Sequence, residues 1–322
     1  MKKTKRVSDF QHEVTTEKKP WTHLDFGDRG GEDFCFAIMS DRSGRPRPGV
    51  FENTILTMNK LRPEFVMSVG DFIEGISVED QSRNFLMRQW KKIIPAIRKC
   101  IPPFFYVVGN HDVSCYLKQF PKAHDTQEKL WKDLFGVDHY YFVYKNVLFL
   151  CLNSNDTPEG MGDEQLKWAQ DVLHKHENVR WTFVFQHSPH NWTRGNFLKL
   201  EENLYDRNYT VFSGDLHKYC KYVRNGRKYF MLGMTGCGED VPGIPARGVI
   251  FGEFEHITWV SMCGDKPEIM NIALDGMYDE NVVTTEKITW LTPKYFRANK
   301  KISHAEAQRL RSKGIQIEET EF

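Results

Sequence analysis

Five short polar motifs in the sequence contain side chains that could bind a metal ion or move a proton. They are Ser40-Asp41-Arg42-Ser43, Gly70-Asp71, Gly109-Asn110-His111-Asp112, His187-Ser188-Pro189-His190 and Gly214-Asp215-Leu216-His217. Any one of them alone is more typical of a turn or of a surface histidine. As a set they supply six candidate metal ligands: Asp41, Asp71, Asn110, His187, Asp215 and His217. Mixed oxygen and nitrogen ligands suit Mn, Fe or Zn better than Ca or Mg.

The segment before each motif has the composition of a buried β-strand. The five segments are short, apolar and rich in β-branched and aromatic residues: 34–40, 65–69, 104–108, 181–186 and 209–213. In an open α/β sheet the carboxyl ends of the strands form one edge, and ligands bind there. The order of strands and motifs therefore predicts that the six candidate ligands converge. Glycines before several of the ligands let the backbone turn sharply and approach closely.

Amphipathic stretches of helical length separate these strands. They cover residues 50–61, 78–99, 126–135 and 163–176. Strands that alternate with helices indicate βαβ units and parallel pairing. Residues 140–152 and 219–232 instead predict antiparallel hairpins, about Lys145-Asn146 and Asn225-Gly226, and residues 248–262 predict a further extended stretch. Parallel and antiparallel content together predicts two packed sheets with helices outside.

The two ends of the chain differ in composition from its middle. Residues 1–30 are polar and aperiodic, so we expect an N-terminal arm with little structure of its own. Residues 31–289 carry the predicted domain. Residues 290–322 are basic and polar, with a helix-like stretch at 304–311, and are interpreted as a C-terminal extension, either a tail or a segment that faces a partner.

Composition excludes several classes of protein. Of the 322 residues, 40% are hydrophobic and 27% charged, which excludes a disordered chain. The net charge of +1 argues against long nucleic acid substrates. Seven scattered cysteines without a C-x-x-C pair argue against a disulfide framework and a thiolate zinc site. No apolar run reaches the roughly 18 residues of a membrane helix, and no apolar stretch follows the basic N-terminus, so we expect a cytoplasmic chain without membrane insertion.

The order of the five motifs resembles the calcineurin-like metallophosphoesterase superfamily, whose motifs run Asp-x-His, Gly-Asp-x-x, Gly-Asn-His-Asp/Glu, a lone His and Gly-His-x-His. The resemblance covers roughly residues 34–260 and is strongest in the second and third motifs. It implies an α/β fold, a four-layer αββα sandwich of two packed mixed β-sheets flanked by helices. It also implies two divalent or trivalent metal ions. Asp71 would bridge them, Asp41 and His217 would hold one, and Asn110 and His187 the other.

The sequence departs from the superfamily pattern at two positions. Ser43 stands where the first motif has its His, and Asp215 stands at the first His of the last motif. Asp215 is a competent ligand with a harder, more anionic character. A neutral Ser43 is a poor ligand, so the first metal loses an imidazole. That loss favours Mn or Fe over Zn, or leaves the site with one metal or inactive.

The resemblance implies a metal-dependent phosphoric ester hydrolase. In such an enzyme a hydroxide bridging the two metals would attack phosphorus, and His111, oriented by Asp112, would assist the leaving group. Arg42 is a candidate for contact with the substrate phosphate, because a guanidinium fork matches phosphate oxygens. His190 could reach the substrate from the loop of His187. The alternative for each is a solvent-exposed loop residue. The ligand set does not separate phosphomonoesters from phosphodiesters, and nothing in the sequence indicates an oligomeric state.

Two further hypotheses concern the surroundings of the site. Glu74 is expected to brace the second loop rather than to bind metal. The glycine-rich stretch 233–243 is expected to border the site. The alternative to the enzyme is a binding or scaffold protein of the same fold, in which the altered first and last motifs no longer hold two metals.

Overall fold

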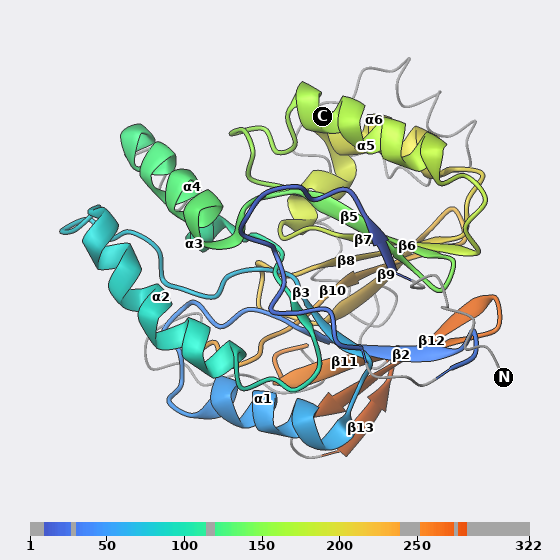
Figure 1. Cartoon of the computed structure of the whole chain (residues 1–322), viewed down its shortest axis with the longest axis horizontal. Helices are drawn as coiled ribbons and strands as arrows, with labels where there is room; N and C mark the ends of the chain where they lie inside the picture. Colours follow the sequence, from blue (N-terminus) through green and yellow to red (C-terminus); the bar gives the residue numbers. More distant parts are fainter. Residues whose placement is uncertain (1–9, 27–29, 114–119, 239–251, 274–275, 282–322) are drawn as a thin grey trace, which may run out of the picture.

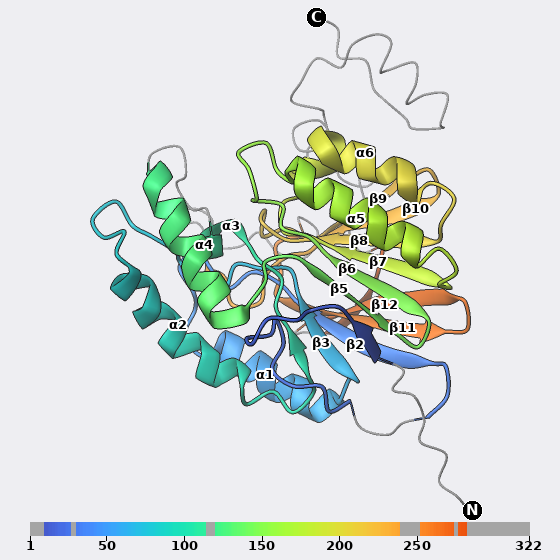
Figure 2. The ribbon, with the colours of Figure 1, turned by 45° about the horizontal axis from the view of Figure 1, so that its top comes forward.

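The computed structural model describes residues 10–26, 30–113, 120–238, 252–273 and 276–281. Two mixed β-sheets pack face to face, with helices on their outer faces (Figure 1). The view in Figure 2 separates the four layers, with α5 and α6 outside one sheet and α1 and α2 outside the other. The predicted α/β sandwich of two sheets is confirmed.

The first sheet has seven strands. Their spatial order is β1 (Phe10–His12), β5 (Tyr140–Tyr144), β6 (Val147–Cys151), β7 (Trp181–Phe185), β8 (Tyr209–Ser213), β10 (Arg227–Met231) and β9 (Cys220–Arg224). The four strands β6, β7, β8 and β10 pair in parallel. The pairs β5–β6 and β9–β10 are antiparallel hairpins, as the sequence predicts. Their turn residues Lys145, Asn146 and Asn225 adopt positive φ.

The second sheet has six strands. Their order is β13 (Gly276–Asp279), β12 (Lys266–Ala273), β11 (His256–Cys263), β2 (Phe34–Met39), β3 (Phe65–Ser68) and β4 (Phe104–Phe105). The pairs β2–β3 and β3–β4 are parallel, whereas β11 joins β2 and β12 in antiparallel fashion. The carboxyl ends of β2, β3 and β4 therefore share one edge of this sheet, where the first three motifs begin.

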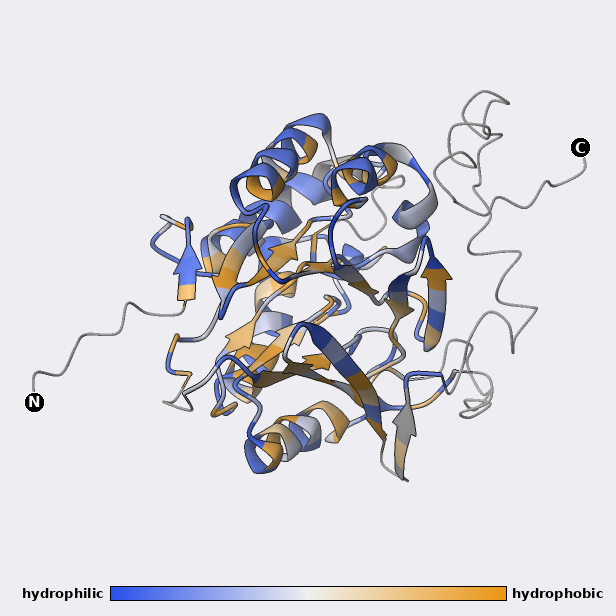
Figure 3. Ribbon diagram, turned by 90° about the vertical axis from the view of Figure 1, so that its right-hand side faces the viewer, coloured by the Kyte–Doolittle hydropathy of each residue, from blue (hydrophilic) through white to orange (hydrophobic). Residues whose placement is uncertain are grey.

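Aromatic side chains fill the space between the sheets. The ring centroid of Phe36, on β2, lies 5.2 Å from that of Phe149 and 5.1 Å from that of Phe183, both on the opposite sheet. All three side chains are fully buried. Figure 3 shows apolar residues on the strands and on the inward faces of the helices. Burial of this apolar surface holds the two sheets together.

The helices cover the outer faces through apolar stripes. The second sheet carries α1 (Val50–Leu61), α2 (Arg83–Ile97), the single turn α3 (Asn110–Val113) and α4 (Pro121–Phe135); the first carries α5 (Asp163–Lys175), the short η1 (Pro189–Thr193) and α6 (Gly195–Leu204). In α1 the buried residues are Phe51, Ile55 and Met58, a spacing of four and three that places them on one face. Within the described residues, no helix is both long and apolar enough to cross a bilayer.

Several element boundaries differ from those predicted. Helix α2 starts at Arg83 rather than at residue 78, because the Ser82 hydroxyl caps it by accepting a hydrogen bond from the backbone N–H of Phe85. Helix α4 starts at Pro121, five residues before the predicted start at 126. Strand β4 has only two residues. The elements α6, β12 and β13 were not predicted. Residues 248–251 of the expected extended stretch, and all of 290–322, lie outside the described residues.

Part of the segment 1–30, which was predicted to be an N-terminal arm, packs against the sandwich. Strand β1 pairs with β5 in antiparallel fashion, with Phe10 opposite Tyr144. Trp21 is buried, and its ring centroid lies 5.7 Å from that of Phe105. Aromatic packing therefore attaches residues 10–21 to the sandwich, although the segment has no periodic apolar pattern.

Candidate metal centre

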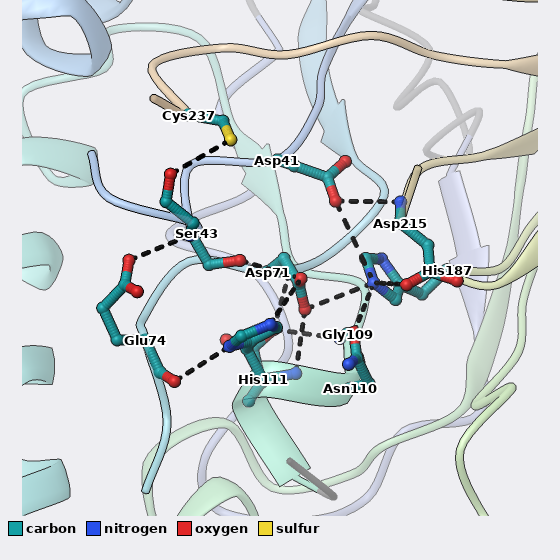
Figure 4. A network of polar contacts seen from close by, with 12 residues as sticks. Asp41, Ser43, Asp71, Glu74, Gly109, Asn110, His111, His187, Asp215 and Cys237 are labelled. Atoms are coloured by element: carbon teal, nitrogen blue, oxygen red, sulfur yellow. Dashed lines mark hydrogen bonds and ion pairs between the residues drawn. The ribbon is translucent and has the colours of Figure 1, made fainter. Parts of the chain in front are cut away.

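The five motifs meet at one place, between the carboxyl ends of strands from both sheets (Figure 4). Ligand atoms of Asp41, Asp71 and His187 all lie within 4.8 Å of one another, and all three side chains are buried. Each of the six predicted ligands has a polar atom 3.6 Å or less from another member of the set. The structure therefore brings together all six residues that the sequence singled out as metal ligands.

Asp71 occupies the middle of this cluster. Its Oδ1 accepts a hydrogen bond of 3.0 Å from the backbone N–H of His111, and its Oδ2 accepts one of 2.9 Å from the Ser43 hydroxyl. Its backbone has φ 63°, in the left-handed region that non-glycine residues seldom adopt. Such a conformation is typical of functional sites, where the surrounding structure enforces it.

The His187 imidazole is completely buried and its orientation is fixed. Nδ1 lies 2.7 Å from the backbone carbonyl of Val69, which can only accept, so Nδ1 carries a proton and donates it. Nε2 faces Oδ1 of Asn110 at 2.8 Å and Oδ1 of Asp71 at 3.3 Å. Burial alone would lower the pKa of this imidazole, but Asp71, Asp41 and Asp215 raise it to about 10.

Asp41, Asp215 and His217 form the other side of the cluster. Oδ1 of Asp41 accepts a 2.8 Å hydrogen bond from the backbone N–H of Asp215 and lies 3.6 Å from Nε2 of His217. Oδ1 of Asp215 lies 3.6 Å from Nε2 of His187. Asp215 and His217 also have positive φ, of 73° and 54°. The loop after β8 is therefore held in an uncommon conformation that turns both residues toward the strand ends.

The charges of the cluster fit a bound cation. Burial raises the pKa of Asp41, and the nearby carboxylate of Asp71 raises it further, although His187 and His217 oppose both effects. Burial also acts to raise the pKa of Asp71, but His187 and His111 outweigh it and hold the pKa below its usual range. Two buried carboxylates that face one imidazole make a donor set suited to a divalent or trivalent ion.

Three glycines permit the close approach of these loops. A Cβ on Gly109 would lie 2.2 Å from Oδ1 of Asp71, and a Cβ on Gly214 would lie 2.2 Å from Oδ2 of Asp41. A Cβ on Gly70 would lie 2.6 Å from the backbone nitrogen of Gly109. Any side chain at these positions would displace a metal-site carboxylate or separate the two loops.

Ser43 lies at the centre, although it is a poor metal ligand. It is completely buried, and its hydroxyl donates to Asp71, as described above. The side chain that replaces the superfamily's histidine therefore hydrogen-bonds to the central carboxylate. Of the residues predicted to hold the first metal, Asp41, Asp71 and His217 all lie in this cluster.

Asp112 does not have the partner that the sequence suggested. Its carboxylate accepts hydrogen bonds from the backbone N–H groups of Asp71, Phe72 and Gly109, at 2.9, 3.0 and 2.9 Å. Burial and the nearby charge of Asp71 raise its pKa to about 7. Asp112 therefore joins the backbones of the second and third motifs. A sequence pattern does not show that three amide groups lie within hydrogen-bonding distance of its carboxylate.

Glu74 orients His111 and also braces the site. Its backbone carbonyl lies 2.8 Å from Nδ1 of His111, and its carboxylate accepts a 3.0 Å hydrogen bond from the backbone N–H of Gly44. Glu74 thus connects the second motif to the loop of the first. Nε2 of His111 lies 4.0 Å from Oδ2 of Asp71, and the side chain is one-quarter exposed. The imidazole can therefore reach both the cluster and solvent.

The two predicted substrate contacts lie beside the cluster. Arg42 is half-buried, and its guanidinium donates a 3.0 Å hydrogen bond to the backbone carbonyl of Phe72. Burial lowers its pKa, against the opposing charges of Glu52 and Glu74. His190 is half-buried on η1. Burial lowers the pKa of its imidazole, and the negative charge of Asp215 partly offsets this lowering.

Sequence reasoning missed Cys237. Its thiol is fully buried, 3.1 Å from Nδ1 of His217. The glycine-rich stretch 233–243 was predicted to border the site, and its described residues 233–238 do reach it. Cys237 stands between two glycines of this stretch, and that is the signal that could have identified it.

Comparison with known proteins gives a consistent picture. A family model of calcineurin-like phosphoesterases matches residues 8–219. The serine/threonine-protein phosphatase CPPED1 of Mus musculus is 26% identical over 229 residues, covering 64% of this chain and 71% of the mouse protein. The CPPED1 protein of Homo sapiens is 29% identical over 149 residues, covering 43% of this chain and 44% of the human protein. The chain therefore matches less than half the length of the human relative.

Two solved structures share the fold. PhoD superposes with a TM-score of 0.55 at 10% sequence identity, covering 77% of this chain and 71% of PhoD. GAP50, the anchor in the inner membrane complex of Plasmodium, superposes with a TM-score of 0.53 at 14% identity, covering 77% of this chain and 88% of GAP50. At these identities the likeness concerns the fold alone.

Proposed function

The chain belongs to the calcineurin-like phosphoesterase family, and from that premise we propose that it hydrolyses an ester of phosphoric acid with the help of bound metal ions. The observation that carries this proposal is the convergence of Asp41, Asp71 and His187, buried and within 4.8 Å of one another. Their charges and donor atoms suit a cation, and they come from three motifs far apart in the sequence.

We assign the ligands as the sequence suggested. Asp71 would bridge two metal positions, one held by Asp41 and His217 and the other by Asn110, His187 and Asp215. Metal ions held there would supply hydroxide at neutral pH and neutralise the phosphate oxygens. The first position has one imidazole and two carboxylates, a donor set that favours Mn or Fe over Zn.

The chain's own residues handle the substrate and the proton. The Glu74 carbonyl holds His111 through Nδ1. Nε2 faces the leaving oxygen, and the protonated ring, an imidazolium, donates its Nε2 proton to that oxygen and becomes neutral. Asp112 has a positioning role, because it fixes the backbone of Asp71. Arg42 and His190 lie beside the cluster and are assigned to the substrate phosphate.

The substrate is a small phosphorylated molecule. The relatives named serine/threonine-protein phosphatase favour a phosphomonoester as the first substrate to test, although their identity to this chain is only 26–29%. The near-neutral net charge of +1 argues against a long nucleic acid. The cytoplasmic location stays a prediction from the sequence.

The test is metal analysis combined with turnover. Purified protein is assayed for bound metal and for hydrolysis of a chromogenic phosphomonoester and phosphodiester, with and without added Mn²⁺. We expect metal binding and turnover in the wild type, and loss of both in Asp71→Asn with an unchanged circular dichroism spectrum. If the protein binds no metal and shows no turnover with any divalent ion, that result contradicts the enzyme and supports the scaffold alternative.

A further inference from the structure

The Cys237 sulfur lies between two parts of the candidate metal centre. It is 3.1 Å from Nδ1 of His217 and 3.3 Å from the backbone carbonyl of Gly44, which follows the first motif. The carbonyl of Gly238 lies 3.5 Å away. Cys237 comes from the loop after β10, so this contact brings a sixth segment of the chain to the five motifs.

The ring nitrogen of His217 can either donate to the Cys237 sulfur or accept from it. The carbonyls of Gly44 and Gly238 can only accept, and both lie within reach of the S–H group, so we take the S–H group to donate to one of them. The sulfur is then left as an acceptor toward the ring of His217, and Nδ1 of that ring carries the proton. The proton-free nitrogen is Nε2, the atom that faces Oδ1 of Asp41 at 3.6 Å. A metal ion binds the proton-free nitrogen of an imidazole, and the group bonded to the other nitrogen selects it.

The sulfur has a defined position because its backbone is fixed. The carbonyl of Cys237 accepts a 3.2 Å hydrogen bond from Nε of Arg47, and the backbone N–H of Gly238 donates a 2.9 Å bond to the carbonyl of Gly44. Gly44 leaves the necessary space: a Cβ there would lie 2.9 Å from Cε1 of His217 and 3.0 Å from the Cys237 sulfur. The imidazole is therefore confined between Gly44 and the thiol.

We propose that Cys237 is a positioning residue of the metal centre: its sulfur accepts a hydrogen bond from Nδ1–H of His217, so that Nε2 of that ring faces the metal position beside Asp41. This inference rests on the proposed function, since it assigns a role toward the same metal ion. Cys237 would then support the remaining histidine of the first metal, the metal for which Ser43 replaces the other imidazole.

The first experiment measures Mn²⁺ affinity from the electron paramagnetic resonance signal of free Mn²⁺. Loss of the group that hydrogen-bonds to a metal-binding histidine costs roughly 10–100-fold in metal affinity. We therefore expect Cys237→Ala to weaken Mn²⁺ binding at one site by about 10-fold or more. Cys237→Ser should recover part of the loss, because a hydroxyl also accepts and donates. Cys100→Ala is the matched control: Cys100 is equally buried but precedes β4, at the end of the strand opposite the site. Thermal melts check that all variants fold.

A double variant separates this role from general packing. In a His217→Ala background, Cys237→Ala should weaken Mn²⁺ binding no further. Further weakening there, or an unchanged affinity in the single Cys237→Ala variant, would overturn the inference.

The second experiment needs no metal. Imidazole ¹H–¹⁵N correlation spectra of the metal-free protein, at a pH where the ring is neutral, report which nitrogen carries the proton; the His217→Ala spectrum assigns the signal. We expect Nδ1–H for His217 in the wild type and a shift toward Nε2–H in Cys237→Ala. A wild-type proton on Nε2 overturns the inference. A wild type that shows Nδ1–H and yet binds no Mn²⁺ overturns the proposed function alone.

Discussion

The Asp112 carboxylate accepts a 2.9 Å hydrogen bond from the backbone N–H of Asp71, so a residue of the third motif fixes the backbone of the second. The same carboxylate accepts from Phe72 and Gly109. Since Asp71 is held at positive φ, this contact helps to maintain the conformation that places its side chain among the other ligands.

The substitution Asp112→Ala should therefore lower both stability and metal affinity. It leaves three buried N–H groups without their acceptor, and each such group costs about 1–3 kcal/mol. We expect the free energy of unfolding, measured by urea denaturation, to fall by about 3 kcal/mol or more, and Mn²⁺ binding to weaken. The control is Asp133→Ala, an exposed carboxylate paired with Arg83, which should cost less than about 1 kcal/mol. Equal costs at the two positions would refute this role for Asp112.

His111→Ala should reduce turnover without loss of metal. General acid catalysis contributes roughly 10²–10⁴-fold in rate, and the imidazole of His111 is the group assigned to the leaving oxygen. We expect kcat to fall within that range while Mn²⁺ affinity stays within about threefold. The exposed His174 of α5 supplies the control, and His174→Ala should leave kcat unchanged. Full turnover in His111→Ala would remove this residue from the mechanism.

The metal-free protein should lose stability as the pH rises from about 6.5 to 10. The carboxylates around His187 raise its pKa from 6.5 to about 10 in the folded state. A raised histidine pKa stabilises the fold below the unfolded value, and that contribution disappears as pH passes the folded value. The pKa of Asp112, raised to about 7, acts in the same direction at lower pH.

Thermal melts with a chelator present would measure this effect. His187→Asn should flatten the fall in melting temperature across the window from neutral to alkaline pH. Because a metal ion must displace the proton on Nε2, Mn²⁺ affinity should rise over the same window. A melting temperature of the metal-free wild type that rises between pH 7 and pH 10 would contradict the assignment.

Gly109→Ala should abolish metal binding. Its new Cβ would lie 2.2 Å from Oδ1 of Asp71, so the carboxylate or the loop must move. Gly226→Ala is the matched control: its Cβ meets nothing within 4 Å, but φ is +68°. That variant should lose about 1 kcal/mol of stability from backbone strain and keep its Mn²⁺ affinity. Isothermal titration with Mn²⁺ distinguishes the two; tight binding in Gly109→Ala would show that the loops have more room than the structure indicates.

Much of the fold could be predicted from local pattern. The α1 stripe and the Asn225-Gly226 turn are short-range signals, and the structure confirms both. Strand β1 was missed because it has three residues and pairs with β5, more than a hundred residues later in the chain. No local periodicity records such a pairing.

The candidate ligands could be predicted because each follows a strand, and parallel strands bring their ends together. Glu74 was predicted to support the second loop, but the supporting contacts themselves could not be predicted. Asp112 contacts backbone amides, Glu74 contacts His111 through its backbone carbonyl, and Cys237 contacts a neighbouring imidazole. Such contacts depend on loop conformation, for which residue spacing carries no signal.

Strand β1 has a consequence for handling the protein. It covers the outer edge of β5, whose backbone would otherwise present unpaired N–H and C=O groups. An uncovered strand edge is a template on which a second molecule can add its own strand. Residues 10–12 therefore oppose self-association by pairing with this edge. A chain that lacks residues 1–12 should form concentration-dependent aggregates, which light scattering can measure, although these residues lie outside the candidate metal centre.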